Sequence, residues 1–254
     1  MLSDKITLYK YSPANKYLLN NLLTTTIFFN QPSNFNDPYE KGQVFVNKEQ
    51  LEVKHNPHIG VSFNQEENES IFFHGVDYDV SSGLDLNIGM SCFSSTPKEH
   101  LMWTHYAESH RGICLEYEFE IKENRITDIE GDILPLKVEY PSKPMGAPQL
   151  YKNNKNMGRL VPADFYKYKP SQYKYEGETR LISLDKSGIK GVKQTCLKKV
   201  IFGIKLSDED RESILRITNS YRNSVDREYA VPDYNTWEIK TEIHPAYHYK
   251  SPYT

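Results

Sequence analysis

Two carboxylates and a guanidinium alternate late in the chain, at Glu176, Glu178 and Arg180. If residues 175–184 form a strand, side chains two residues apart point to the same face, so these three charges lie together. The apolar run at 181–184 indicates that the strand then enters the core. A carboxylate at the mouth of such a strand can stabilise positive charge that develops in a ligand. The alternative is a solvated face that carries an ordinary ion pair.

A second concentration of reactive side chains lies in residues 90–117, which hold one Trp, three His, two Cys and an Arg. Strands are expected at 90–93 and 112–117, with a helix at 101–110 between them. On that helix Met102, Tyr106 and His110 would share one face. So dense a polar and aromatic helix between two strands favours a pocket. The alternative is that the helix serves the core and its histidines only pack against it.

Metal and thiol chemistry are not predicted for this stretch. His105 and His110 are five residues apart rather than four, and no Cys is spaced to complete a zinc site. Cys92, Cys114 and Cys196 lie in or beside apolar strands, which is typical of reduced core thiols in a cytoplasmic protein.

An earlier loop is dense in turn-forming residues. Asn36 and Asp37 can bond their own backbone, and Pro38 keeps Asp37 out of the helical region. The loop is either a structural turn or a rigid polar rim of a ligand site, in which Phe35 or Tyr39 offers a stacking surface.

Composition excludes several classes of function. The chain has 254 residues and a net charge of −3, so bulk charge does not indicate binding to nucleic acid or to an anionic membrane. No run of about 18 apolar residues is present, and the first residues, MLSDKITLYKYS, contain no apolar signal core. These features predict a cytoplasmic protein that does not span a membrane.

The order of elements predicts an α+β fold. Strands are expected at 6–11, 27–30, 133–140, 200–205 and 237–244, and helices at 13–23 and after Ser207, whose side chain forms a capping box with Asp210. We expect a single domain over residues 1–254, with a mixed and mainly antiparallel sheet and flanking helices. Residues 41–87 would form an insertion or a lid.

Five motifs in order resemble a large bacterial family of unknown function. They are FNDPYE (35–40), SCFS (91–94), MWTHYA (102–107), HRGICLEY (110–117) and YEGETRL (175–181). The resemblance covers roughly residues 7–205 and implies that this part of the chain is a domain of unknown function.

The order of elements also resembles the ADP-ribosyltransferase superfamily. Arginine-specific members carry Ser-x-Ser on a middle strand and Glu-x-Glu on a late strand. Here the middle strand offers Ser91, Ser94 and Ser95, and the late strand offers Glu176 and Glu178. Lys10 stands where that superfamily has a first-strand Arg or His.

This second resemblance implies NAD as the substrate. Glu178 would stabilise the ribose as the nicotinamide bond breaks, Tyr106 or Tyr11 would stack on nicotinamide, and Arg111 or Lys10 would meet the pyrophosphate. The implied catalytic residues are Glu178, Glu176 and Tyr106. The implied NAD-binding residues are Lys10, Tyr11, Phe35, Asn36, Asp37, Ser94, His105 and Arg111, and no metal is implied.

Two functions of different classes follow. The first is an NAD-using ADP-ribosyltransferase-like or NAD glycohydrolase-like enzyme, a toxin or phage-defence effector that binds a small nucleotide ligand and a protein partner in a defence system. The second is a non-enzymatic ligand-binding sensor module of a bacterial defence or stress system.

Overall fold

The computed structural model describes residues 4–35, 51–52, 61–63, 70–71, 88–142 and 166–243. Contacts divide the chain into two compact units. The first comprises Met1–Asn30, Gly89–Lys137 and Tyr175–Thr254, and the second comprises Gln31–Ile88 and Val138–Lys174. Strands dominate and a few helices accompany them, so the α+β class is confirmed. The single-domain organisation stays a prediction.

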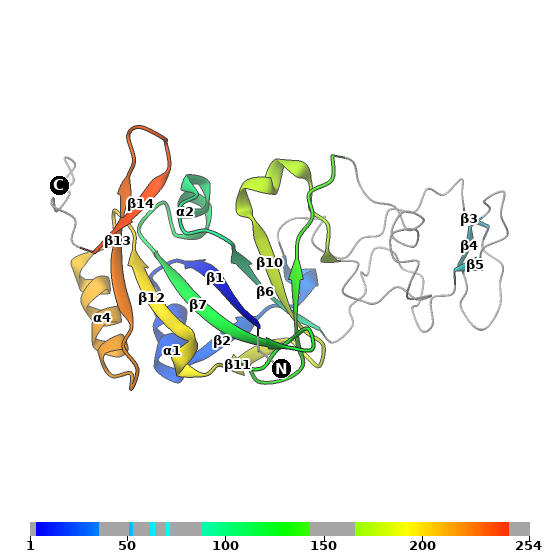
Figure 1. Cartoon of the computed structure of the whole chain (residues 1–254), viewed down its shortest axis with the longest axis horizontal. Helices are drawn as coiled ribbons and strands as arrows, with labels where there is room; N and C mark the ends of the chain where they lie inside the picture. The colour runs from blue at the N-terminus through cyan, green and yellow to red at the C-terminus, as the bar shows by residue number, and fades with distance from the viewer. Residues whose placement is uncertain are drawn as a thin grey trace. The chain divides into compact units, whose positions relative to one another are not determined.

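A nine-stranded sheet forms the framework of the first unit (Figure 1). Its neighbours are antiparallel except for one parallel pair, the seventh and eighth strands of the order. In spatial order the strands are β1 (Asp4–Ser12), β6 (Gly89–Ser94), β10 (Glu178–Ser183), β9 (Ile133–Lys137), β8 (Arg125–Ile126), β7 (Ile113–Lys122), β12 (Leu197–Phe202), β13 (Asp226–Pro232) and β14 (Ile239–Glu242).

The first six strands of this order form a closed ring, because β1 also pairs along its whole length with β7. Single residue pairs join β1 to β6, at Tyr9 and Ser94, and β8 to β9, at Ile126 and Ile133. Strands β12, β13 and β14 extend the sheet beyond β7, so β14 is its outermost strand.

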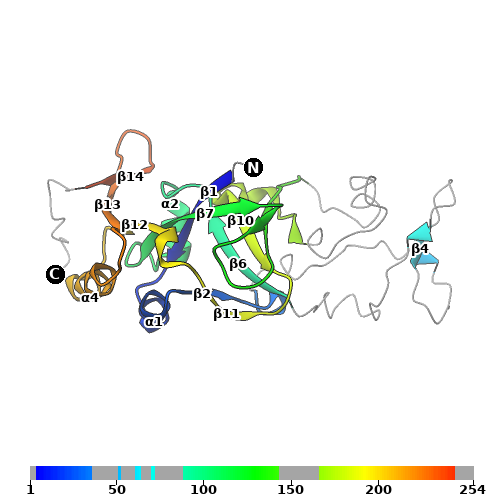
Figure 2. The same cartoon turned by 60° about the horizontal axis from the view of Figure 1, so that its bottom comes forward.

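Helices cover both faces of this sheet. Helices α1 (Lys16–Thr24) and α4 (Asp208–Asn219) contact each other on one face, and α2 (His100–Tyr106) lies on the other, as Figures 1 and 2 show. Side-chain caps mark the first turns of α1 and α4. The Asn15 side chain accepts hydrogen bonds from the first turn of α1, and Ser207 caps α4, as predicted.

Alternation along β7 separates two cores. Leu115, Tyr117 and Phe119 point to the face of α1 and α4, where the larger apolar cluster lies. Cys114 points to the opposite face, where Trp103 of α2 packs in a smaller cluster. The strand is apolar at successive positions because both of its faces are covered.

Shorter elements complete the two units. In the first unit, β2 (Thr26–Phe29) pairs with β11 (Gly188–Gly191), and a 3₁₀ turn at Gln194–Cys196 precedes β12. A 3₁₀ turn at Ser171–Glu176 ends just before β10. Within the second unit, a 3₁₀ turn spans Pro32–Asn34 and three short strands form an antiparallel sheet: β3 (Leu51–Glu52), β4 (Val61–Phe63) and β5 (Ser70–Ile71).

The helix expected at 101–110 is shorter than its sequence predicts. It ends at Tyr106, and Glu108, Ser109 and His110 have positive φ angles of 49°, 54° and 70°. His110 therefore does not share a helical face with Met102 and Tyr106. Its ring stacks on Trp103 instead, and its backbone NH donates to the Trp103 carbonyl.

Two strands also begin later than expected, at Glu178 and at Ile239. Cys92, Cys114 and Cys196 are free thiols, as predicted. Within the described part of the chain, no helix combines the length and apolar character needed to cross a bilayer.

Candidate functional site

The first part of the candidate site is an ion pair at the start of β10. Arg180 donates from Nε to Oε1 of Glu178 at 2.8 Å and from Nη2 to Oε2 at 3.3 Å. Alternation places both side chains on one face, as predicted, and they are 0% and 4% exposed. β10 lies inside the sheet, between β6 and β9, and the pair on its face is buried rather than solvated. An ion pair with two hydrogen bonds fixes the orientation of both side chains as well as balancing their charges.

The second part is the carboxylate of Glu176, which lies in the 3₁₀ turn rather than in the strand. Its Oε1 accepts a hydrogen bond from the Tyr106 hydroxyl at 2.7 Å, and its backbone carbonyl accepts one from Ser94 Oγ at 2.7 Å. Gly177 connects the turn to β10 with φ +51°, and a Cβ there would lie 2.4 Å from Ser95 Oγ. This glycine therefore lets the chain turn Glu176 away from the regular strand direction.

An aromatic surface adjoins Glu176. Tyr106 is 42% exposed, although its hydroxyl is held by the carboxylate. The exposed ring of His105 lies 6.4 Å from the Tyr106 ring and 6.5 Å from the Tyr175 ring, measured between centroids. Of the predicted residues, Tyr106, His105, Glu176, Glu178 and Ser94 are thus brought together by contacts or by register.

Trp103 anchors the helix that carries Tyr106 and His105. It is fully buried and donates from Nε1 to the Pro97 carbonyl at 2.7 Å. Its ring meets that of Tyr11 edge-on at 5.2 Å between centroids. Tyr11 donates its hydroxyl hydrogen bond to the Thr96 carbonyl, and burial raises its pKa. This environment suits a structural role for Tyr11 better than stacking on nicotinamide.

Lys10 does not join the carboxylates. Residue Tyr9 is registered with Ser94, and Ser94 with Glu178, so Lys10 lies on the opposite face of the sheet. There its Nζ donates to Ser91 Oγ at 2.9 Å and lies 4.8 Å from the centre of the Phe93 ring. Burial lowers the pKa of Lys10. Register thus places the Lys10 side chain on the face of the sheet opposite Glu178 and Ser94, because one residue along a strand moves a side chain across the sheet.

The remaining predicted residues lie elsewhere. Arg111 is exposed in the turn after α2. Phe35 belongs to the second unit, and Asn36 and Asp37 lie outside the described residues, as do residues 38–40 of the same loop.

Sequence reasoning missed a polar row on the α2 face of the sheet. Lys199 on β12 pairs with Glu228 at 2.6 Å and with Glu116 at 3.6 Å. Tyr9 on β1 is registered with Glu116, and burial together with that carboxylate raises the pKa of Tyr9 to about 12. Alternation in residues 112–117 places Glu116 on the face opposite Leu115 and Tyr117. The sequence therefore indicated which face Glu116 occupies. It did not indicate the partners of Glu116, because they come from strands that are distant in the sequence.

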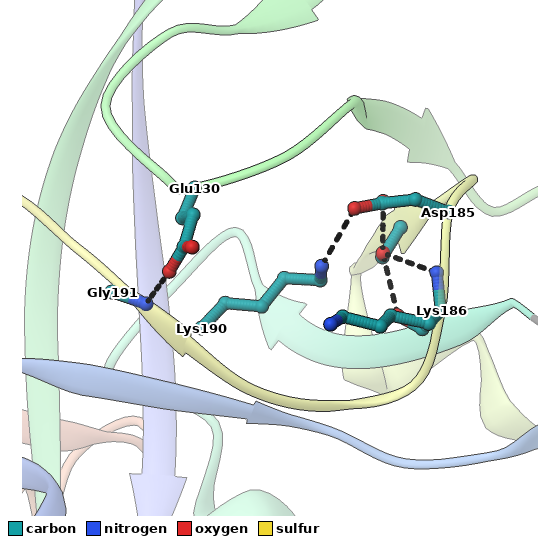
Figure 3. Close-up of polar contacts among 6 residues, drawn as sticks. Glu130, Asp185, Lys186, Lys190 and Gly191 are labelled. Atoms are coloured by element: carbon teal, nitrogen blue, oxygen red, sulfur yellow. Dashed lines mark hydrogen bonds and ion pairs between the residues drawn. The ribbon is translucent and has the colours of Figure 1, made fainter.

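A different polar cluster lies at the far end of β10 (Figure 3). Lys190 Nζ lies 3.1 Å from Oδ2 of Asp185, and Ser183 Oγ lies 2.8 Å from Oδ1 of the same carboxylate. Close by, the NH of Gly191 donates to Glu130 at 3.3 Å. The bonds of Asp185 close the turn between β10 and β11, and the Glu130 bond ties β11 to the loop before β9. The described residues contain no group of three or more His, Cys, Asp or Glu side chains placed to hold a metal ion.

Residues 102–181 match the model of a family described as a protein of unknown function, DUF2971. No curated protein and no solved structure matches the chain. The matched range begins in α2 and ends in β10, so it includes Tyr106, Glu176, Glu178 and Arg180. This part of the chain is therefore similar to a family whose function is not known.

Proposed function

We propose that the chain is an NAD-using enzyme, either an ADP-ribosyltransferase-like or an NAD glycohydrolase-like protein, with Glu176 as its principal carboxylate. The observation that carries this proposal is the contact between Glu176 and Tyr106. It joins a buried carboxylate to an exposed aromatic ring, with His105 and Tyr175 beside it. An aromatic ring next to a carboxylate suits a ligand with a flat base and a ribose that gains positive charge.

The two glutamates would have different roles. Glu178 is held by Arg180 at two points, so its charge is already matched inside the protein. Glu176 accepts a hydrogen bond from the Tyr106 hydroxyl, which orients the carboxylate beside the exposed aromatic ring. This reverses the ranking that the superfamily resemblance implies, in which Glu178 acts on the ribose. Glu178 and Arg180 would instead position the start of β10.

The proposed cleavage of NAD needs little more than a carboxylate beside an aromatic ring. The bond between ribose C1′ and nicotinamide nitrogen breaks, and nicotinamide leaves with the bonding electron pair. Positive charge then develops on C1′ and the ring oxygen, and a nearby carboxylate stabilises it. Water or an acceptor group adds at C1′ and loses its proton, which gives ADP-ribose or an ADP-ribosylated product. Tyr106 would stack on the nicotinamide ring that departs.

An enzyme that consumes NAD or modifies a target would act as a toxin or a phage-defence effector. This part of the proposal rests on the resemblance of the chain to the ADP-ribosyltransferase superfamily.

The test compares three glutamine variants for release of nicotinamide from NAD. Glu176→Gln preserves an acceptor for Tyr106 but removes the charge, so it should lower turnover by about a hundredfold or more, with little change in Tm. The control is Glu118→Gln on β7, which removes a carboxylate paired with Lys5 and should leave turnover unchanged. Glu178→Gln should destabilise the protein, because it removes the charge of the buried carboxylate that Arg180 meets at two points. If Glu176→Gln retains wild-type turnover, Glu176 is not the catalytic carboxylate.

The second candidate is a non-enzymatic sensor module that binds a nucleotide. One observation favours it: Glu178 and Arg180 are almost completely buried and satisfy each other, as in a structural network. A calorimetric titration with NAD and with ADP-ribose separates the two functions. Binding of either ligand without release of nicotinamide, weakened equally by Glu176→Gln and Tyr106→Ala, would support the sensor and contradict the enzyme.

A further inference from the structure

The turn that follows α2 is held closed although its backbone is strained. Residues 108–110 all have positive φ angles, a region that costs free energy for residues other than glycine. Backbone hydrogen bonds keep the chain there. The His110 NH donates to the Trp103 carbonyl at 3.1 Å, and the His110 carbonyl accepts from the Lys205 NH at 2.9 Å. The turn therefore stores strain that would be relieved if these contacts were lost.

The ring of His110 packs inside this turn. It is 7% exposed and stacks on the Trp103 ring at an interplanar angle of 8°, with 6.3 Å between centroids. Its Nδ1 is buried and has no hydrogen-bond partner among the described residues. Such a position suits a neutral ring better than a charged one, because burial removes the water that a charge needs. The separation from Trp103 lies at the limit of cation–π attraction, about 6 Å, so the tryptophan adds little to stabilise a charged ring.

The other ring nitrogen determines where the neutral ring holds its proton. Nε2 of His110 lies 3.4 Å from Thr104 Oγ1, and that hydroxyl already donates to the His100 carbonyl at 3.1 Å. Thr104 can therefore only accept from the ring, which places the proton on Nε2 and leaves Nδ1 bare. In acid the second proton adds at Nδ1, where the closed turn offers it no acceptor among the described residues.

The charged groups around the ring also oppose a positive charge on it. The ring of His100, an exposed residue at the start of α2, lies 5.0 Å from the ring of His110. Lys205 approaches from the segment that follows β12. Burial, then His100 and then Lys205 lower the pKa of His110 from its usual 6.5 to about 4. The ionisable residues beside it in the turn, Glu108 and Arg111, are both exposed.

We propose that the turn at residues 107–111 is an acid-sensitive switch, in which a second proton on His110 drives its ring away from Trp103 and opens the turn. Opening hydrates the charge and relieves the backbone strain. Tyr106 is the last residue of α2 and directly precedes the turn, and its hydroxyl donates to Glu176. The opening therefore loosens the candidate site from the side of α2. The switch is a property of the fold and does not depend on the reaction proposed above.

The pKa difference sets the direction and the range of the response. In the open turn the His110 ring is hydrated and titrates near 6.5, whereas in the closed turn it titrates near 4. The open form binds more protons between these two values, so acid favours opening. The ratio of open to closed turn should rise by up to about 300-fold as the pH falls from 7 to below 4. Above pH 6.5 the turn stays closed.

Trp103 reports the opening in the full chain. The chain has two tryptophans and Trp237 is 90% exposed, so Trp237→Phe leaves Trp103 as the only one. Its emission should move reversibly to longer wavelength as the pH falls from 7 to 4, while far-ultraviolet circular dichroism shows that the sheet is retained. His110→Phe in the same background keeps a flat ring on Trp103 but cannot be protonated, so its emission should stay constant. His105→Gln removes an exposed histidine from the same helix and is the matched control, which should respond as its parent does.

Nuclear magnetic resonance of the histidine rings gives an independent measurement in the Trp237→Phe protein. At neutral pH the His110 proton should lie on Nε2, and the titration of this ring should coincide with the change in Trp103 emission. An emission change that is the same in His110→Phe, or no change down to pH 4 when His110 is present, overturns the proposal. A His110 ring that takes up its second proton while the Trp103 emission stays constant also overturns it.

Discussion

The two ends of β10 each hold a carboxylate paired with a cation, but in different surroundings. At its start, Glu178 and Arg180 are 4% and 0% exposed and meet at two points. At its end, Asp185 is 43% exposed, and its Oδ2 makes a single contact of 3.1 Å with Nζ of the buried Lys190. The first pair lies within a strand that is hydrogen-bonded on both sides, and the second lies in a turn.

This difference shows that the sequence spacing of two charged residues does not by itself define the role of the ion pair they form. Water can replace a lost partner at Asp185, and it cannot do so at Glu178. The candidate site lies at the end where charges are sequestered, because a ligand's charge is felt strongly only where water is excluded. The turn at the other end has a sufficient explanation in holding β10 to β11.

The largest expected effect comes from removing the cation at the buried end. Arg180→Met should remove the guanidinium that meets the buried Glu178 carboxylate at two points and lower the free energy of unfolding by about 3–5 kcal/mol. Urea denaturation measures this directly. The double variant E178Q/R180M removes both charges, and it should recover part of the loss. If it is less stable than Arg180→Met alone, the pair is not coupled as its geometry indicates.

A similar loss is expected when the anchor of α2 is removed. Trp103 is fully buried against the sheet, where its ring meets that of Tyr11 on β1, so Trp103→Ala should cost about 3–5 kcal/mol. The matched control is the other tryptophan, Trp237, which is 90% exposed and whose replacement by Ala should change stability by less than about 0.5 kcal/mol. Equal effects of the two substitutions would contradict the packing described for α2, and with it the placement of Tyr106.

Much of the fold could be predicted because its signals are local. Ser207 and Asp210 mark the start of α4 by a side-chain cap, and the period of two along β10 placed Glu178 and Arg180 on one face. These features depend on a few neighbouring residues, and the surrounding structure did not override them.

The remaining features depend on distant residues. The helix before His110 ends early because the chain turns back, so that the His110 carbonyl accepts from Lys205 and Gly203 packs against the same backbone. Lys10 lies on the far face because β1 is registered against β7, which a single strand's sequence does not specify. The row at Glu116 and Lys199 was missed for the same reason.

A smaller loss is expected at the exposed end of β10. Lys190→Met removes the cation from Asp185, but that carboxylate is 43% exposed and can be hydrated. The loss of stability should be about 1 kcal/mol or less, because water can hydrate the carboxylate that remains and the Met side chain suits the buried position of Lys190. Comparison with Arg180→Met under the same conditions tests the contrast between the two ends. A cost equal to that of Arg180→Met would show that burial does not distinguish them.

The smallest effect concerns how the same turn responds to acid. Burial alone would raise the pKa of Asp185, but hydrogen bonds from Ser183 and Lys190 outweigh it, and the pKa lies below its usual value of 3.8. A carboxyl with a lowered folded-state pKa contributes stability above its unfolded-state pKa, and this contribution is lost as the pH falls through the folded-state value. Asp185→Asn should therefore melt slightly below the wild type near neutral pH, and the gap should close between roughly pH 5 and pH 2. The exposed Asp226→Asn is the control. A gap that stays constant as the pH falls would show that Asp185 stabilises the turn by its shape rather than by its charge.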